Sequence, residues 1–242
     1  MGCDSKHAED DTVVKEFQNL DAWKGPTLQV LLARLAAHSN DRIRIYTVAT
    51  TRLKRETQTV CQIGSGPNLE GSVATLCTCK HSMRQSHSAE DWKGKWVLGL
   101  TARAKSKGFA GTHFLFYLMK VAAAFNSHSE MYAYLSANNN NALLAKNAIR
   151  NRLGDVYEPR PTCNAPLNPL MYKPPHNDHT HGRGEQWHDD IIYGGKSSPL
   201  LLGDVSNTFV WPKPLIKFRG QRGVGNMKLT IGEDLFSLLE SD

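Results

Sequence analysis

The 242-residue chain is long enough for one large domain, and its 40% hydrophobic residues can form a sizeable core, which excludes wholesale disorder. A formal net charge of +6 favours an anionic partner, nucleic acid above all, although charge alone defines no function. The five cysteines show no regular spacing, and no apolar run approaches the roughly twenty residues of a membrane span. We therefore expect a soluble, cytoplasmic protein with no membrane partner.

The first part of the sequence predicts helices. Apolar residues recur at helical spacing over 12–23, and Gly25-Pro26 interrupts the run. A stripe of leucines predicts a second helix over 27–38. We expect residues 1–41 to form a helical extension that packs on a domain over residues 42–242. An alternative role for this extension is self-association, and the sequence leaves the oligomeric state open.

Strands are expected through the rest of the chain. Alternation over 42–49 predicts a strand with one buried face. The stretch 71–100 predicts a strand over 72–76, a short basic helix, a charged turn and a strand over 96–100, and a long loop is expected over 51–72. The further expected elements are strands over 112–121, 199–202, 207–211 and 215–218, and helices over 130–135, 142–153 and 232–239.

These elements define a fold class. About six strands alternate irregularly with short helices and long loops, so regular strand–helix–strand units are not indicated. The pattern argues for an α+β fold built on a small, mostly antiparallel barrel or curled sheet.

Several short motifs occur in an order that resembles the nucleotide modification associated domain 2 family. The resemblance spans roughly residues 42–212. It rests on Tyr46, Gly66-Pro67-Asn68, Cys77-Thr78-Cys79-Lys80, Met83-Arg84, Asp91-Trp92, 96–99, 116–121, 153–157 and 209–211. The turn before the strand over 96–99 departs from the compact Gly-Asp pair that is usual in the family.

The resemblance extends to the superfamily of PUA-like barrels, which includes the EVE, YTH and ASCH domains. It implies a PUA-like barrel with peripheral helices that recognises a modified base of DNA or RNA, or a modified nucleotide, in a pocket at the barrel rim. Because ASCH relatives include amidohydrolases, it equally implies an enzyme that makes or removes a base modification. The sequence does not decide between recognition and catalysis.

Basic side chains are the first candidates for nucleic-acid contact. Lys80 and Arg84 are four residues apart and would share one face of a short helix. With Arg44 they form a candidate phosphate track, since phosphate contacts supply most non-specific affinity. Other basic residues of this set are Arg42, Arg52, Lys54 and Arg55. The alternative is a solvated basic face without a ligand.

Aromatic and polar side chains are candidates for contact with the base. Trp92 and Trp187 lie in polar stretches, where an exposed ring would stack on an extruded base. Tyr157 belongs to a motif of the resemblance, and Asn68 or Asp155 would hydrogen-bond a base edge. For any single tryptophan, core packing is the alternative that we prefer.

Metal and catalytic candidates are weaker. His176, His179 and His181 carry the ligand chemistry of a zinc or iron site, but their spacing matches no established metal motif, and a polar loop is the preferred interpretation. We predict no cofactor. An enzyme of the hydrolase type, metal-assisted or not, would draw on Lys80, Asp155, His181 or Cys79.

Overall fold

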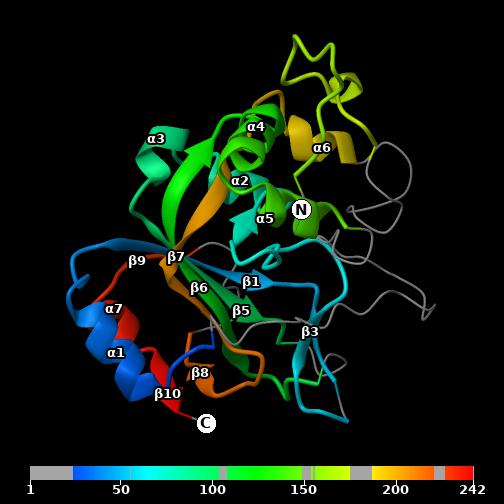
Figure 1. Cartoon of the computed structure of the whole chain (residues 1–242). Helices are drawn as coiled ribbons and strands as arrows, with labels where there is room; N and C mark the ends of the chain where they lie inside the picture. Colours follow the sequence, from blue (N-terminus) through cyan, green and yellow to red (C-terminus); the bar gives the residue numbers. More distant parts are fainter. Residues whose placement is uncertain are drawn as a thin grey trace. The chain divides into compact units, whose positions relative to one another are not determined.

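Figure 1 shows a computed structural model of the chain, which describes residues 24–54, 56–103, 108–148, 154, 156–174, 187–220 and 227–241. The helix expected over 12–23 lies outside these residues. The described residues fall into two compact units. The sheet unit comprises residues 24–61, 94–121 and 204–241, and the helical unit comprises 62–93 and 122–203. Within the described part of the chain, no helix has the length and apolar character to cross a membrane.

The sheet unit is built on a curled, mixed sheet that forms a half-barrel (Figure 1). The strands on the main path of this eight-stranded sheet are β1 (Arg42–Val48), β5 (Trp96–Thr101), β6 (His113–Phe125), β8 (Ile216–Phe218), β9 (Met227–Thr230) and β10 (Leu239–Ser241). They follow the order β10-β8-β6-β5-β1-β9, in which the β1–β5 pair is parallel and the other pairs are antiparallel. The α+β class and the curled sheet are thus confirmed.

Helices α1 (Leu28–Ala36) and α7 (Glu233–Phe236) cover the apolar face of this sheet. Leu31 and Leu35, one helical turn apart, are fully buried in a core that also contains Leu235 of α7. The predicted helix over 27–38 is therefore present, and it packs on the strands that follow it. Its buried stripe follows from the leucine spacing in the sequence.

Several strands differ from the expectations. A single strand, β7 (Leu200–Val210), replaces the two strands expected over 199–202 and 207–211. Gly203 does not interrupt it, because its amide donates to the carbonyl of Ala74 and so continues the hydrogen bonding between strands. The expected long loop contains the short strands β2 (Thr51–Leu53) and β3 (Val60–Gln62). Strand β1 is buried on both faces toward its end, since Tyr46 and Val48 are inaccessible as well as Ile45. The sequence also did not predict β9 and β10.

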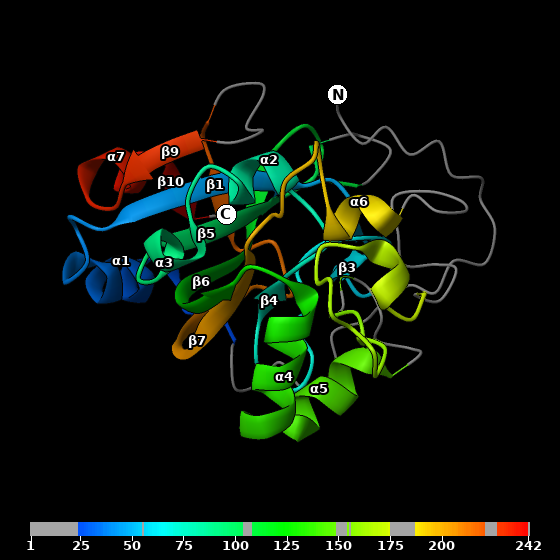
Figure 2. The same cartoon turned by 90° about the horizontal axis from the view of Figure 1, so that it is seen from above.

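The helical unit holds most of the helices. They are α2 (His81–Arg84), α3 (Ala89–Trp92), α4 (His128–Asn138), α5 (Asn140–Asn147), the 3₁₀ helix η4 (Pro169–Met171) and α6 (His188–Ile191). Ser127 caps α4 by accepting the amide of Glu130, and Asn139 caps α5 by accepting the amide of Ala142. These caps explain why the asparagine run divides two helices that lie side by side (Figure 2).

A short strand and two apolar clusters complete the helical unit. Strand β4 (Thr75–Leu76) pairs antiparallel with the beginning of β7. One cluster joins α4 and α5 to this pair through Met131, Leu143 and Leu200. The second contains Tyr157, Tyr172, Trp187 and Ile191 and packs beside α6.

Candidate functional site

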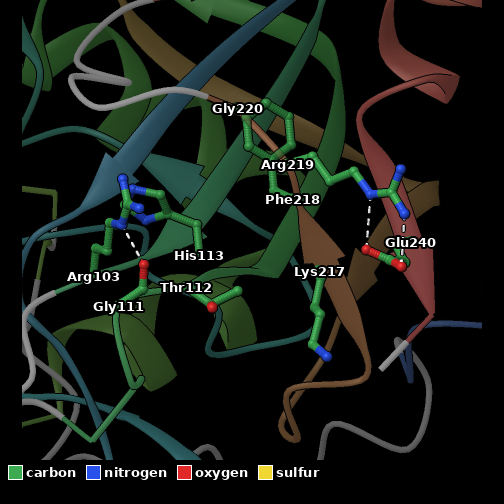
Figure 3. Close-up of a pocket in the computed structure, with 9 residues that line it drawn as sticks. All are labelled: Arg103, Gly111, Thr112, His113, Lys217, Phe218, Arg219, Gly220 and Glu240. Carbon is green, nitrogen blue, oxygen red and sulfur yellow. Dashed lines mark hydrogen bonds and ion pairs between the residues drawn. The ribbon is translucent and has the colours of Figure 1, made fainter.

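A pocket opens in the sheet unit where β6 begins and where β8 and β10 run beside it (Figure 3). The sheet register places His113 opposite Phe218, and Lys217 opposite Glu240. We call this the basic pocket, and its volume is about 260 Å³. It is lined by Arg103, Gly111, Thr112, His113, Lys217, Phe218, Arg219, Gly220 and Glu240.

Charge in the basic pocket is predominantly positive. The lining contains three cations, Arg103, Lys217 and Arg219, and one carboxylate, Glu240, so it has a formal charge of three minus one, or +2. Glu240 binds the Arg219 guanidinium through both oxygens, at 2.8 Å and 2.7 Å. Arg219 lowers the pKa of this carboxyl group, which therefore stays ionised. The excess positive charge makes the pocket suitable for an anion.

The remaining lining residues set the character of the pocket. Burial lowers the pKa of His113, and its Nδ1 donates to the carbonyl of Thr101 at 2.7 Å, so its imidazole is neutral at pH 7. Phe218 is only 3% exposed and offers no ring face for stacking. A Cβ added at Gly220 would lie 2.1 Å from the Phe218 ring, so the backbone must approach the ring closely here. The pocket therefore offers charge and hydrogen bonds rather than aromatic surface.

One more cation, Arg52, lies next to Arg103 at the same edge of the sheet. The parallel strands β1 and β5 end together, and the hydroxyl of Thr51 accepts the amide of Ala102 at 2.8 Å. Arg52 and Arg103, which follow these two residues, are both exposed. Arg103 donates to the carbonyl of Gly111, which holds its guanidinium at the pocket (Figure 3).

The helical unit contains a different kind of site, a buried group of polar side chains around Asp190. His81 Nε2 lies 3.1 Å from one carboxylate oxygen of Asp190, and the Tyr157 hydroxyl donates to the other at 2.6 Å. His128 bonds the backbone carbonyl of Asp190 at 3.3 Å. We call these four residues the carboxylate cluster. None is more than 6% exposed.

The two imidazoles of the carboxylate cluster are neutral. His128 Nδ1 accepts the amide of Tyr157 at 3.0 Å, while its Nε2 donates to a carbonyl, and this arrangement requires the neutral ring. Burial and the nearby Arg84 cation lower the pKa of His128 to about 3. The same two causes lower the pKa of His81 to about 3 and outweigh the opposing effect of Asp189. Neutral His81 then donates its Nε2 hydrogen to the carboxylate.

Arg84 is a buried cross-link of the backbone. Its Nε donates to the carbonyl of Cys79 at 2.8 Å, and its Nη1 donates to the carbonyls of Ser198 and Pro199 at 2.7 Å and 2.9 Å. The carbonyl of Arg84 in turn accepts the indole N–H of Trp92. The exposed basic face that we expected from Lys80 and Arg84 is thus not formed. Lys80 precedes α2 in a left-handed conformation (φ 58°), so the two side chains do not share a helix face.

The sequence-based candidates are distributed as follows. Tyr157, Trp187 and Arg84 come together around the carboxylate cluster, with the Tyr157 and Trp187 ring centroids 5.5 Å apart. Asn68 is fully buried, and its carbonyl accepts the Lys146 ammonium at 3.0 Å.

Trp92 and Cys79 are also buried, while Lys80 is half-buried. A contact of Trp92 or Trp187 with a base stays a prediction, and it requires the ring to leave its packed position. Asp155, His176, His179 and His181 lie outside the described residues.

Sequence reasoning did not connect His81, His128 and Asp190 as one site. Their segments are far apart in the chain, and no spacing signal connects them. Among the described residues, no group of three His, Cys, Asp or Glu side chains is placed to hold a metal ion.

Comparison of the sequence with protein-family models finds no match, and comparisons with curated proteins and with solved structures find no similar protein.

Proposed function

We propose that the protein binds nucleic acid, DNA or RNA, or a modified nucleotide, and that the basic pocket holds a phosphate. The observation that carries this proposal is the presence of Arg103, Lys217 and Arg219 in the lining of one pocket that contains a single carboxylate. Arginine and lysine are the side chains that contact phosphate oxygens most often, and such contacts fix the position of a nucleic acid without reading its sequence.

Arg44 supports a longer phosphate track on the same unit. It lies on β1 directly opposite Lys228 of β9, and directly opposed residues of an antiparallel pair point to the same side of the sheet. Two cationic side chains placed next to each other in this way could both contact one phosphate. Arg44 therefore remains in the proposed interface.

Recognition of a modified base is the part of the proposal that rests on the family resemblance. A PUA-like barrel would place the base in a pocket at its rim, and the curled half-barrel supports this part of the proposal only at the level of a curled sheet. Because the basic pocket has no exposed ring, we assign it to phosphate and not to the base. Lys80, which is half-buried before α2, remains a candidate for a second phosphate contact.

The test is fluorescence anisotropy with short oligonucleotides, plain or carrying modified bases, at two salt concentrations. We expect affinity to fall steeply with salt, and expect Lys217→Ala to lower the slope of log K against log [salt] by roughly 0.7–0.9. Lys24→Ala, an exposed lysine of the same unit outside the pocket lining, is the matched control and should leave the slope unchanged. Tighter binding of one modified base that persists at high salt would support base recognition. Absence of binding at low salt would contradict the proposal.

An enzyme that makes or removes a base modification is the second candidate. The carboxylate cluster is the observation that favours it, because a buried His–Asp pair with a tyrosine has the groups needed for general acid–base catalysis. We expect Tyr157→Phe to abolish turnover of modified nucleosides, followed by mass spectrometry, while oligonucleotide binding persists. Full turnover in Tyr157→Phe and in His81→Gln would exclude this cluster as the catalytic site.

A further inference from the structure

We infer that the basic pocket selects a terminal phosphate, the phosphomonoester of a strand end or of a mononucleotide, over the internal phosphodiesters of a strand. This inference rests on the proposed function, since it names the kind of phosphate that the same pocket takes. It is carried by the net charge of the pocket and by the position of Glu240.

The pocket is small enough to suit a single phosphate group. Its volume of about 260 Å³ lies just below the range of roughly 300–1,000 Å³ that is typical of small-molecule sites. It is walled by the start of β6, by β8 and by β10.

Charge favours the same ligand. The lining carries a formal +2 from three cations and one carboxylate, with His113 neutral. A phosphomonoester carries a charge of about −1.5 to −2 at pH 7, with a second pKa near 6. An internal phosphodiester carries only one negative charge, so it would leave the pocket incompletely neutralised.

Glu240 occupies the position of the expected ligand on Arg219. Its two oxygens bind Nε and a terminal nitrogen of the guanidinium, in the fork geometry that arginine uses for phosphate as well as for carboxylate (Figure 3). Lys217 lies opposite Glu240 in the strand register. A phosphate bound here would exchange with the carboxylate on Arg219, so Glu240 acts as an internal competitor.

The experiment compares three oligonucleotides of one sequence, which carry a 5′-phosphate, a 3′-phosphate or no terminal phosphate. At pH 7.5 we expect at least one phosphorylated form to bind about tenfold more tightly than the unphosphorylated form. This advantage should shrink below pH 6, where the monoester loses its second charge. A nucleoside 5′-monophosphate, added as a competitor, distinguishes a mononucleotide from a strand end as the natural ligand. Effective competition identifies a mononucleotide ligand, and failure to compete identifies a strand end.

Variants link the effect to the pocket. Lys217→Ala should abolish the advantage of the terminal phosphate, whereas Lys24→Ala should preserve it.

Glu240→Gln raises the formal charge of the pocket lining from +2 to +3 and releases Arg219, so it should tighten binding of the phosphorylated form several-fold. Weaker binding in Glu240→Gln would overturn the competitor role. Equal binding of all three oligonucleotides would overturn the selection but not the proposed function, whereas no binding of any would overturn both. Circular dichroism of each variant confirms that the fold is retained.

Discussion

Replacing Arg84 by methionine is expected to lower the free energy of unfolding by about 3–5 kcal/mol. The guanidinium is fully buried and satisfies the carbonyls of Cys79, Ser198 and Pro199, which would be left in the interior without their donor. Methionine keeps most of the volume of the side chain, so the loss reports the missing hydrogen bonds rather than a cavity. Urea denaturation followed by tryptophan fluorescence measures this change.

Arg160→Met provides the matched control for Arg84→Met. Arg160 is exposed and its side chain bonds the carbonyl of Leu170 at 3.0 Å, so we expect a loss of no more than about 0.5–1 kcal/mol. Equal losses in the two variants would show that Arg84 is not the cross-link described above.

Lowering the pH should destabilise the protein already below pH 6.5, at pH values above those at which ordinary carboxylates titrate. The pKa values of His81 and His128 in the folded protein are about 3, below the ordinary value of 6.5, so the unfolded chain binds more protons than the folded chain between these values. Stability is therefore complete above pH 6.5 and is lost as the pH falls. Each histidine contributes a slope of about 1.4 kcal/mol per pH unit, so the two together approach ~3 kcal/mol per unit.

His128→Gln tests the origin of this slope. Urea unfolding at pH 7.5, 6.5, 5.5 and 4.5 should show that the variant loses stability about half as steeply as the parent below pH 6.5. The comparison at pH 7.5 gives the non-ionic cost of the substitution, because the ring is neutral there in both states. An unchanged slope would mean that His128 becomes protonated inside the folded protein.

The elements predicted correctly are those whose local pattern is strong. The leucine stripe of α1 determines both the type of element and the face that is buried, whereas the apolar residues of β1 and β5 determine the type of element only, because β5 is buried throughout and β1 is buried on both faces toward its end. Strands β9 and β10 have three or four residues each and weak patterns, so only their pairing with β1 and β8 makes them strands. The basic pocket depends on that pairing, because β10 supplies Glu240. Its composition was therefore beyond prediction from local sequence.

The carboxylate cluster shows a second limit. Its contacts join residues up to 109 positions apart, such as His81 and Asp190, and no periodicity relates them. A charged residue in a polar segment is usually exposed, and that general rule led to the expectation of a surface role for Arg84. The burial of Arg84 follows from three backbone carbonyls that converge on it, which is a property of the assembled unit and not of its sequence neighbourhood.

The pairing of β1 with β9 has a consequence for synthesis of the protein on the ribosome. Arg42 donates a hydrogen bond to Thr230, which lies 188 residues later in the chain. One edge of β1 therefore stays unpaired until β9, its partner strand, has been translated. At 5–20 residues per second the interval is on the order of 10–40 s, during which that edge carries unpaired backbone groups. Nascent chains paused within this interval should therefore be more prone to associate with one another, or to be held by chaperones, than chains on which β9 has emerged.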